Sequence, residues 1–109
     1  MTVEERLEKV ERELAALKAD KNAIKAHEFA LEDASGRVRA KLTIVGDGAG
    51  LFLFDDNGEQ RVGLSMAKEG PSFVLFDKYG KQRSGMIVTD YGSLFVLFDE
   101  NGQHLWQAP

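Results

Sequence analysis

The sequence contains no cysteine, only two prolines and no long apolar run. One of its longest apolar stretches runs only from Gly50 to Phe54. Without cysteine the chain forms no disulfide and no thiolate metal site. A transmembrane helix needs roughly 18 consecutive apolar residues, and the start of the chain lacks the apolar segment of a signal peptide. The 14 basic and 18 acidic side chains disfavour binding to nucleic-acid phosphates. We therefore expect a cytoplasmic protein that binds no nucleic acid and does not insert into a membrane.

Glycine, proline and aromatic side chains are absent from residues 1–28 and frequent in residues 29–109. The first segment consists largely of Glu, Lys, Ala, Leu and Arg, which favour helix, and Thr2 followed by Glu5 has the pattern of a capping box. The second segment holds all 11 glycines and all seven phenylalanines, as expected for strands joined by turns. The sequence thus predicts an α+β protein with a helical domain over residues 1–28 and a β-domain over residues 29–109.

Apolar side chains recur along the first segment with the spacing of a coiled-coil heptad. The a positions are Leu7, Leu14 and Lys21, and the d positions are Val3, Val10, Leu17 and Ile24. Two apolar positions in seven form a stripe that is too narrow to face a globular core and that fits a coiled-coil seam. Lys21 departs from the pattern, because three ammonium groups near one axis would repel one another and weaken that layer.

The charged residues beside the stripe favour parallel association of identical helices. The g residues Arg6, Glu13 and Asp20 would face the e residues Glu11, Lys18 and Lys25, and each pair has opposite charges. Leucine at a with Val or Ile at d disfavours a dimer and favours three or four strands. The segment from Arg6 to Glu11 also resembles the R-h-x-x-h-E motif of short parallel three-stranded coiled coils, which implies a trimer. The alternative is a solvated helix whose charges match by chance. The predicted oligomerisation residues are Val3, Arg6, Leu7, Val10, Glu11, Leu14, Leu17 and Ile24.

The second segment is built from a 22-residue repeat. Asp33, Asp55, Asp77 and Asp99 recur with this period, as do Gly36, Gly58, Gly80 and Gly102. The repeats cover residues 29–50, 51–72, 73–94 and 95–109, and the last is truncated. Each repeat reads as an apolar run, an Asp-x-x-Gly turn, an alternating run and a longer connection with glycine, which is the pattern of a β-hairpin. We therefore predict an antiparallel meander of seven or eight strands.

The repeat also predicts a turn geometry and a core face. In the turn from Asp55 to Gly58, the aspartate accepts local hydrogen bonds and the glycine takes a positive φ, as in a type I turn followed by a bulge. With Asp55 opposite Glu59, the predicted core face holds Phe52, Phe54, Val62, Leu64 and Met66, with Val74, Phe76, Met86 and Val88 in the next repeat. On the predicted opposite face Arg61 and Gly63 alternate with leucine and phenylalanine, so the first strand of each hairpin is apolar on both sides.

Two apolar faces are more than the β-domain can cover alone, since small domains bury only about 60 to 65% of their unfolded surface. The heptad runs to Ile24 and the first strand begins near Phe29, which leaves almost no linker. Three parallel helices would therefore continue into three sets of hairpins around one axis, as a trimeric β-prism-like body or an intertwined assembly of sheets. A monomeric eight-stranded meander barrel is the alternative.

The unit F-x-L-x-D-x-x-G-x-x-R and a C-terminal W-x-A-P tail are both present. Phe29, Leu31, Asp33, Gly36 and Arg39 carry the unit, and Trp106, Ala108 and Pro109 carry the tail. With the N-terminal coiled coil, this arrangement resembles an uncharacterised bacterial family over nearly the whole chain, which implies the fold and no particular activity. A weaker similarity is to the tyrosine-aspartate repeats of large toxin shells, but Glu or Phe replaces the tyrosine before each aspartate here.

No residue pattern indicates a catalytic or metal site. His27 and His104 have no second ligand at metal-binding spacing, and the sequence has neither a P-loop nor a nucleophile elbow. A column of Arg39, Arg61 and Arg83 either binds an anion or glycan, or lies beside the turn aspartates of its own hairpins. We therefore expect no enzyme activity and no cofactor. The leading hypothesis is a non-enzymatic homotrimeric structural or interaction module, and the alternative is a glycan or small-ligand binding domain that uses the arginine column.

Overall fold

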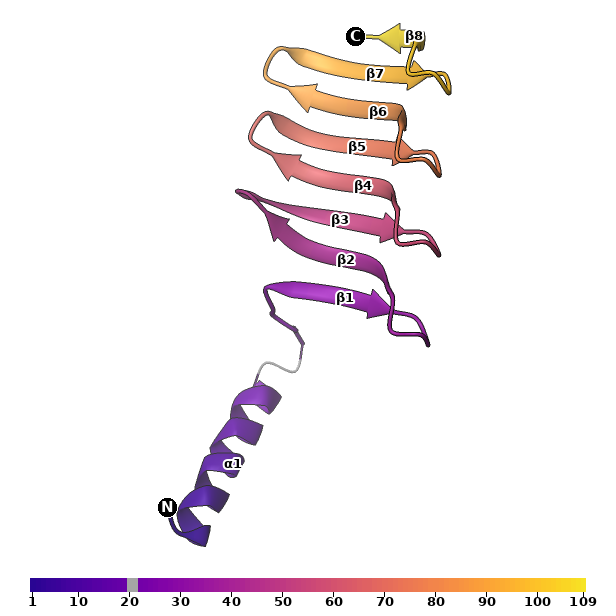
Figure 1. The fold of residues 1–109 in the computed structure, drawn as a ribbon. Coiled ribbons are helices and arrows are strands. Elements are labelled where there is room, and N and C mark those ends of the chain that lie inside the picture. Colours follow the sequence, from indigo (N-terminus) through magenta and orange to yellow (C-terminus); the bar gives the residue numbers. More distant parts are fainter. Residues whose placement is uncertain (20–21) are drawn as a thin grey trace.

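The computed structural model describes residues 1–19 and 22–109, which form one helix followed by one sheet (Figure 1). Helix α1 spans Val3–Ala19. The strands are β1 Glu28–Glu32, β2 Val38–Val45, β3 Gly48–Phe54, β4 Gln60–Ala67, β5 Gly70–Phe76, β6 Gln82–Thr89, β7 Gly92–Phe98 and β8 His104–Ala108. All eight strands lie antiparallel to their neighbours in the order of the sequence, so the predicted α+β class and β-meander are confirmed.

Helix α1 begins with the predicted cap. The Oγ1 atom of Thr2 accepts a hydrogen bond of 3.1 Å from the backbone N–H of Glu5. This bond satisfies one of the N–H groups that the first turn of a helix leaves without an intrahelical partner. Glu4 and Glu5 also place negative charge near the positive end of the helix dipole. The local sequence therefore explains why the helix starts at Val3.

The helix is shorter than predicted. It ends at Ala19, and residues 22–27 are not helical. Asp20 and Lys21, the predicted g and a residues, lie outside the described residues. Asp20 and Asn22 are of types that favour caps and turns over helix interiors, which explains why the heptad pattern does not extend the helix. The prediction that Ile24 and Lys25 occupy heptad positions of this helix is therefore wrong, and a linker separates α1 from β1.

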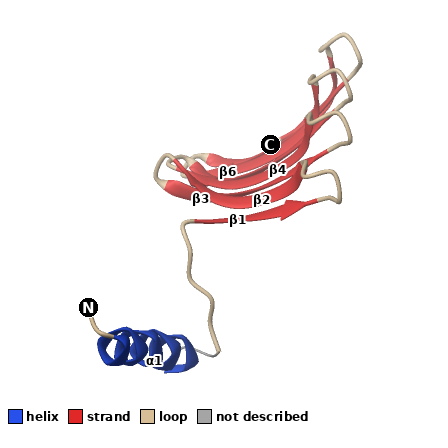
Figure 2. Cartoon of the chain, turned by 60° about the horizontal axis from the view of Figure 1, so that its bottom comes forward, coloured by secondary structure: helices blue, strands red, loops and turns tan. Residues whose placement is uncertain are grey.

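The helix stands apart from a single-layered, curved sheet (Figures 1 and 2). Within residues 1–19 and 22–109, α1 contacts no strand. The sheet is open, since β1 pairs with β2 and β8 pairs with β7, and these two strands form its edges. The alternative of a closed monomeric barrel is therefore wrong. No helix in the described part of the chain has the length and apolar character needed to cross a lipid bilayer.

Four equivalent turns, each with the Asp-x-x-Gly sequence, join the two strands of each repeat. After β3, the N–H of Gly58 donates to the carbonyl of Asp55 (3.0 Å) and the N–H of Asp55 donates to the carbonyl of Glu59 (2.9 Å). The Oδ1 atom of Asp55 accepts bonds of 2.9 and 3.0 Å from the N–H groups of Asn57 and Glu59. Gly58 has a φ of 82°, and the equivalent glycines have φ values of 83° or 84°. The predicted turn geometry is confirmed in every repeat.

The connections between consecutive repeats, at the strand ends opposite the Asp-x-x-Gly turns, are shorter than predicted. Ala67 pairs with Gly70, and Thr89 pairs with Gly92, so that each connection is a turn of two residues. The residues assigned to longer loops extend the strands instead. The strands of neighbouring repeats therefore pair as regularly as the two strands within one repeat.

A β-bulge occurs beside each Asp-x-x-Gly turn. Leu53 pairs with Val62, whereas Phe54 pairs with Gln60, so Arg61 is an extra residue in β4. The equivalent extra residues are Arg39 in β2, Arg83 in β6 and Leu105 in β8. Such a bulge interrupts the alternation of side chains between the two faces. It also bends the strand locally and directs the extra side chain away from the regular rows.

The bulges change which residues share a face, because one extra residue moves every following side chain to the other side of the sheet. The predicted core face is therefore wrong. Phe52, Phe54, Val74 and Phe76 lie on one face, whereas Val62, Leu64, Met66, Met86 and Val88 lie on the other. The second group shares its face with the leucines and phenylalanines at odd positions of β3, β5 and β7, such as Leu51 and Phe73.

The isolated chain has almost no core. In the described part of the chain, Val96 is the one large apolar side chain that is buried, with 7% of its surface exposed. The exposed large apolar side chains concentrate on α1 and on one face of the sheet. This distribution makes those two surfaces the candidates for function.

Candidate functional site

The first candidate surface is the α1 stripe. Its residues are Val3, Leu7, Val10, Leu14 and Leu17, which are 49% to 80% exposed. Their spacing places them along one side of the helix. Arg6 and Glu11, which the sequence assigns to the flanks of this stripe, are exposed as well. The structure therefore brings together every predicted oligomerisation residue except Ile24, which lies in the linker.

The second candidate surface is one face of the sheet, which we call the apolar sheet face. Its middle row consists of Phe29, Leu42, Leu51, Leu64, Phe73, Met86, Phe95 and Ala108. The row beside the Asp-x-x-Gly turns consists of Leu31, Ala40, Leu53, Val62, Leu75, Ser84, Leu97 and Trp106. The row beside the two-residue turns consists of Ile44, Ala49, Met66, Pro71, Val88 and Ser93. These rows hold no charged residue, and their exposed large side chains range from 36% to 65% exposure.

The apolar sheet face has two shallow hollows between its side chains. One, of about 290 Å³, is lined by residues that include Leu64, Phe73 and Met86. The other, of about 300 Å³, is lined by residues that include Leu42, Leu51 and Leu64. Such hollows accept apolar side chains from a facing surface, since close packing requires side chains of one layer to enter the gaps of the next.

The opposite sheet face is covered more fully by its own side chains. Phe52 pairs with Gly63, and a Cβ atom on Gly63 would lie 3.6 Å from the Phe52 ring and 2.8 Å from the Nε2 atom of Gln60. Ser65 and Ser72 form a hydrogen bond of 3.1 Å between their hydroxyl groups across β4 and β5. Large side chains that cover neighbouring glycines, together with polar groups, leave less apolar surface exposed on this face than on the other.

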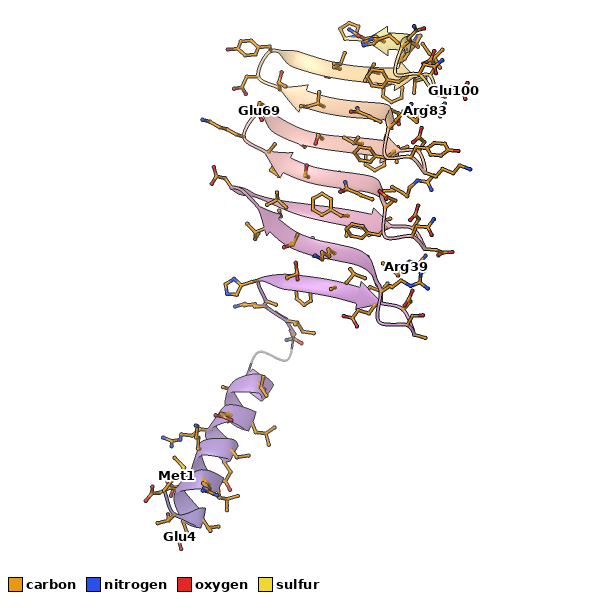
Figure 3. The ribbon with its side chains drawn as sticks, in the orientation of Figure 1. Met1, Glu4, Arg39, Glu69, Arg83 and Glu100 are labelled. Atoms are coloured by element: carbon orange, nitrogen blue, oxygen red, sulfur yellow. The ribbon has the colours of Figure 1, made fainter. Side chains whose placement is uncertain are left out.

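The arginine column links consecutive repeats at the strand ends beside the Asp-x-x-Gly turns, and Figure 3 labels two of its members, Arg39 and Arg83. The Nε atom of Arg61 donates to the carbonyl of Phe76 at 2.9 Å, and its Nη1 atom lies 3.4 Å from Oδ2 of Asp55. Each arginine therefore bridges the turn aspartate of its own repeat and the strand end of the next. The contacts of Arg39 are 3.4 Å to the carbonyl of Phe54, 3.4 Å to Asp33 and 2.7 Å to Asp56. Those of Arg83 are 3.1 Å to the carbonyl of Phe98 and 3.7 Å to Asp77.

Hydrogen bonds and arginine charges lower the pKa of three turn aspartates. For Asp33 the largest cause is the bond from the N–H of Arg37. For Asp55 and Asp77, the largest single cause is desolvation, which favours the neutral acid and raises the pKa. Two backbone N–H bonds and the nearby arginine together outweigh it, so the pKa of each aspartate is lowered. The carboxylates therefore stabilise the turns in their ionised form, and the arginine column takes part in this arrangement as a structural element.

The two histidines lie far apart in the sequence and in different settings. The His104 ring packs edge-on against Phe98, with 4.9 Å between ring centroids, and His27 directly precedes β1. Within the described residues, no three His, Asp or Glu side chains gather in a way that could hold a metal ion. The chain matches no protein-family model and no curated protein. The resemblance to the repeat family thus rests on the residues alone.

Proposed function

We propose that the protein is a non-enzymatic structural or interaction module that works as a parallel homotrimer. One observation carries the proposal: in the described residues a single large apolar side chain is buried, while two apolar surfaces remain exposed. An isolated sheet layer gains little hydrophobic stabilisation, because folding is driven mainly by removal of apolar surface from water. Association of copies supplies the missing burial.

The α1 stripe supports parallel association of three chains. Val3, Val10 and Leu17 alternate with Leu7 and Leu14 at heptad spacing on the observed helix. Leucine at a with β-branched residues at d favours more than two strands, and opposite charges at g and e favour identical parallel neighbours. Three sheets would then follow the three helices as a β-prism-like body around the same axis. The helices set the number of copies, and the sheets form the rigid part.

A domain that binds glycans or other small ligands through Arg39, Arg61 and Arg83 is the less favoured proposal. Each guanidinium group already contacts a turn carboxylate and a backbone carbonyl. A ligand screen on the intact protein, with all three arginines replaced by Gln as the control, separates the two proposals. The structural proposal expects no ligand whose binding depends on these arginines.

The trimer is tested with a pair of neighbouring substitutions in α1. Leu14→Glu puts a charge in the stripe, and Ala15→Glu puts the same charge on the next residue, which is exposed and outside the stripe. The mass of each variant is measured by light scattering. We expect three times the single-chain mass of 12.1 kDa for the unmodified chain and for Ala15→Glu, and a lower mass for Leu14→Glu. Equal masses for the two variants would contradict assembly through the α1 stripe.

A further inference from the structure

The apolar sheet face and the opposite sheet face differ enough to decide which one lies inside an assembly. We infer that the apolar sheet face is covered by the same face of other copies of this chain, with its middle row directed toward the three-fold axis. The inference rests on the proposed trimer and adds the orientation of the sheet within it. It changes the assignment that the uninterrupted alternation of residues predicts for the first strand of each hairpin, because the bulge places Leu51, in place of Phe52, on the face of Leu64.

The apolar sheet face is larger than a monomer normally exposes. With about 200 Å² for a fully exposed large side chain, its exposed apolar side chains present on the order of 1,200 Å². The largest apolar patch of a typical monomer covers about 300–600 Å², and each partner of a stable complex buries about 800 Å². The patch is therefore large enough to form a stable interface. It runs across the whole sheet, from Phe29 on β1 to Trp106 on β8.

The chemistry of this face identifies its occupant as another copy of the same chain. A face without charges is complemented by a second face without charges, and its hollows take apolar side chains such as its own. The linker keeps the copies close: residues 20–27 separate Ala19 from Glu28, and eight residues reach at most about 29 Å. Sheets held this near to one another have effective concentrations in the millimolar range.

The sizes of the side chains fit three sheets around an axis. A seven-residue strand is about 23 Å long, so three such sheets that enclose a triangle lie about 7 Å from the axis at their midpoints, against about 5 Å in a two-sheet sandwich. The middle of each sheet must then carry the largest side chains, and the corners smaller ones. All three phenylalanines of this face lie in the middle row, whose one small residue is Ala108. The outer rows hold leucines and Trp106 but also four small residues, Ala40, Ala49, Ser84 and Ser93.

Single cysteines test the orientation, because the chain has none of its own. Leu64→Cys and Ser65→Cys place a thiol on opposite faces of β4, and Leu42→Cys and Thr43→Cys do the same on β2. In the isolated chain Leu64 is 47% exposed and Ser65 is half-buried, so position 64 would react faster. Burial between copies reverses this order. The rate of reaction with a maleimide is measured on the native protein and in urea, and the mass of each sample is measured alongside.

We expect the thiols at positions 64 and 42 to react at least about tenfold more slowly than those at 65 and 43, since a reagent reaches them only when the assembly opens. In urea all four should react alike. A trimer in which positions 64 and 42 react as fast as 65 and 43, or in which all four are protected, would overturn the inference and leave the trimer intact. A mass of one chain would instead overturn the proposed function, and the inference with it.

Discussion

At the scale of single residues, the last position of each Asp-x-x-Gly turn favours glycine because its backbone has a positive φ. Gly58 and Gly80 have φ values of 82° and 83°, and no atom lies within 4 Å of a Cβ placed on either. A substitution at these positions therefore meets backbone strain without a steric clash.

Replacement of either glycine should destabilise the protein in the order Asn, Ala and Val, from least to most. Asn tolerates the left-handed conformation, Ala should cost about 1 kcal/mol, and β-branched Val should cost more. Urea unfolding of the six single variants of Gly58 and Gly80, at one fixed protein concentration, measures the free energies. A Val variant as stable as the parent would contradict the turn assignment at that site.

The turn aspartates predict a dependence of stability on pH. The pKa values of Asp33, Asp55 and Asp77 lie below the ordinary value of 3.8, so the unfolded chain binds protons more readily than the folded one. Their stabilising contribution is complete above the unfolded pKa and is lost as the pH falls through the folded pKa values. We expect the urea midpoint to be constant from pH 7 to about pH 5 and to fall below about pH 4.

Asp55→Asn provides the control for this dependence. The amide keeps an oxygen that accepts the local N–H bonds but carries no charge to pair with Arg61. The variant should be less stable than the parent at pH 7, and its stability should fall less between pH 5 and pH 3. The same slope in both proteins over that interval would show that Asp55 is not one of the groups responsible.

At the scale of elements, the arginines hold one repeat against the next. The extra residue of the bulge is arginine in the first three repeats, and each donates to a carbonyl of the following repeat. In the fourth repeat, whose β8 is the edge of the sheet, the extra residue is Leu105. Among the described residues, no strand of a further repeat follows β8, so this position has no carbonyl of a next repeat to which an arginine could donate.

Arg61→Leu should lower the free energy of unfolding by about 1 kcal/mol, because it removes a charge-assisted hydrogen bond at a partly exposed site. Lys68→Leu, in the two-residue turn between β4 and β5, removes the same charge from an exposed residue, and it should change stability by less than about 0.5 kcal/mol. Urea unfolding compares the two. If Lys68→Leu costs as much as Arg61→Leu, the loss reflects net charge and not the bridge between repeats.

The sequence was sufficient to predict the β-hairpins but not the faces of the sheet. The 22-residue period and the Asp-x-x-Gly turns predict the hairpins because turn chemistry is local. The bulge at Arg61 was missed because two-residue alternation of Val62, Leu64 and Met66 is the same with or without it. The signal that marks it is the recurrence of a charged residue between the turn and an apolar alternating run in three repeats.

The helix shows the same difference between local and non-local information. Its cap at Thr2 was predictable from two residues, whereas its end was not. Alanine and lysine after position 22 favour helix, and the apolar Ile24 continues the heptad. A helix in water gains most of its stability from packing, so propensity alone does not extend it past the unfavourable Asp20 and Asn22.

At the scale of the whole molecule, the described residues leave two apolar surfaces exposed, and the proposed assembly would cover both. A sheet one layer thick cannot remove both of its faces from water, and α1 covers neither face within the described residues. The α1 stripe and the apolar sheet face lie on the same chain and are joined by a short linker. Assembly and folding should therefore be one coupled process.

The most direct test of this account is the thermal midpoint of the β-sheet circular dichroism signal over a hundredfold range of protein concentration, with the mass measured at each concentration. If folding depends on association, the midpoint rises with concentration, and the folded protein has three times the mass of one chain. A midpoint that is independent of concentration, with the sheet signal intact at the single-chain mass of 12.1 kDa, would contradict the account.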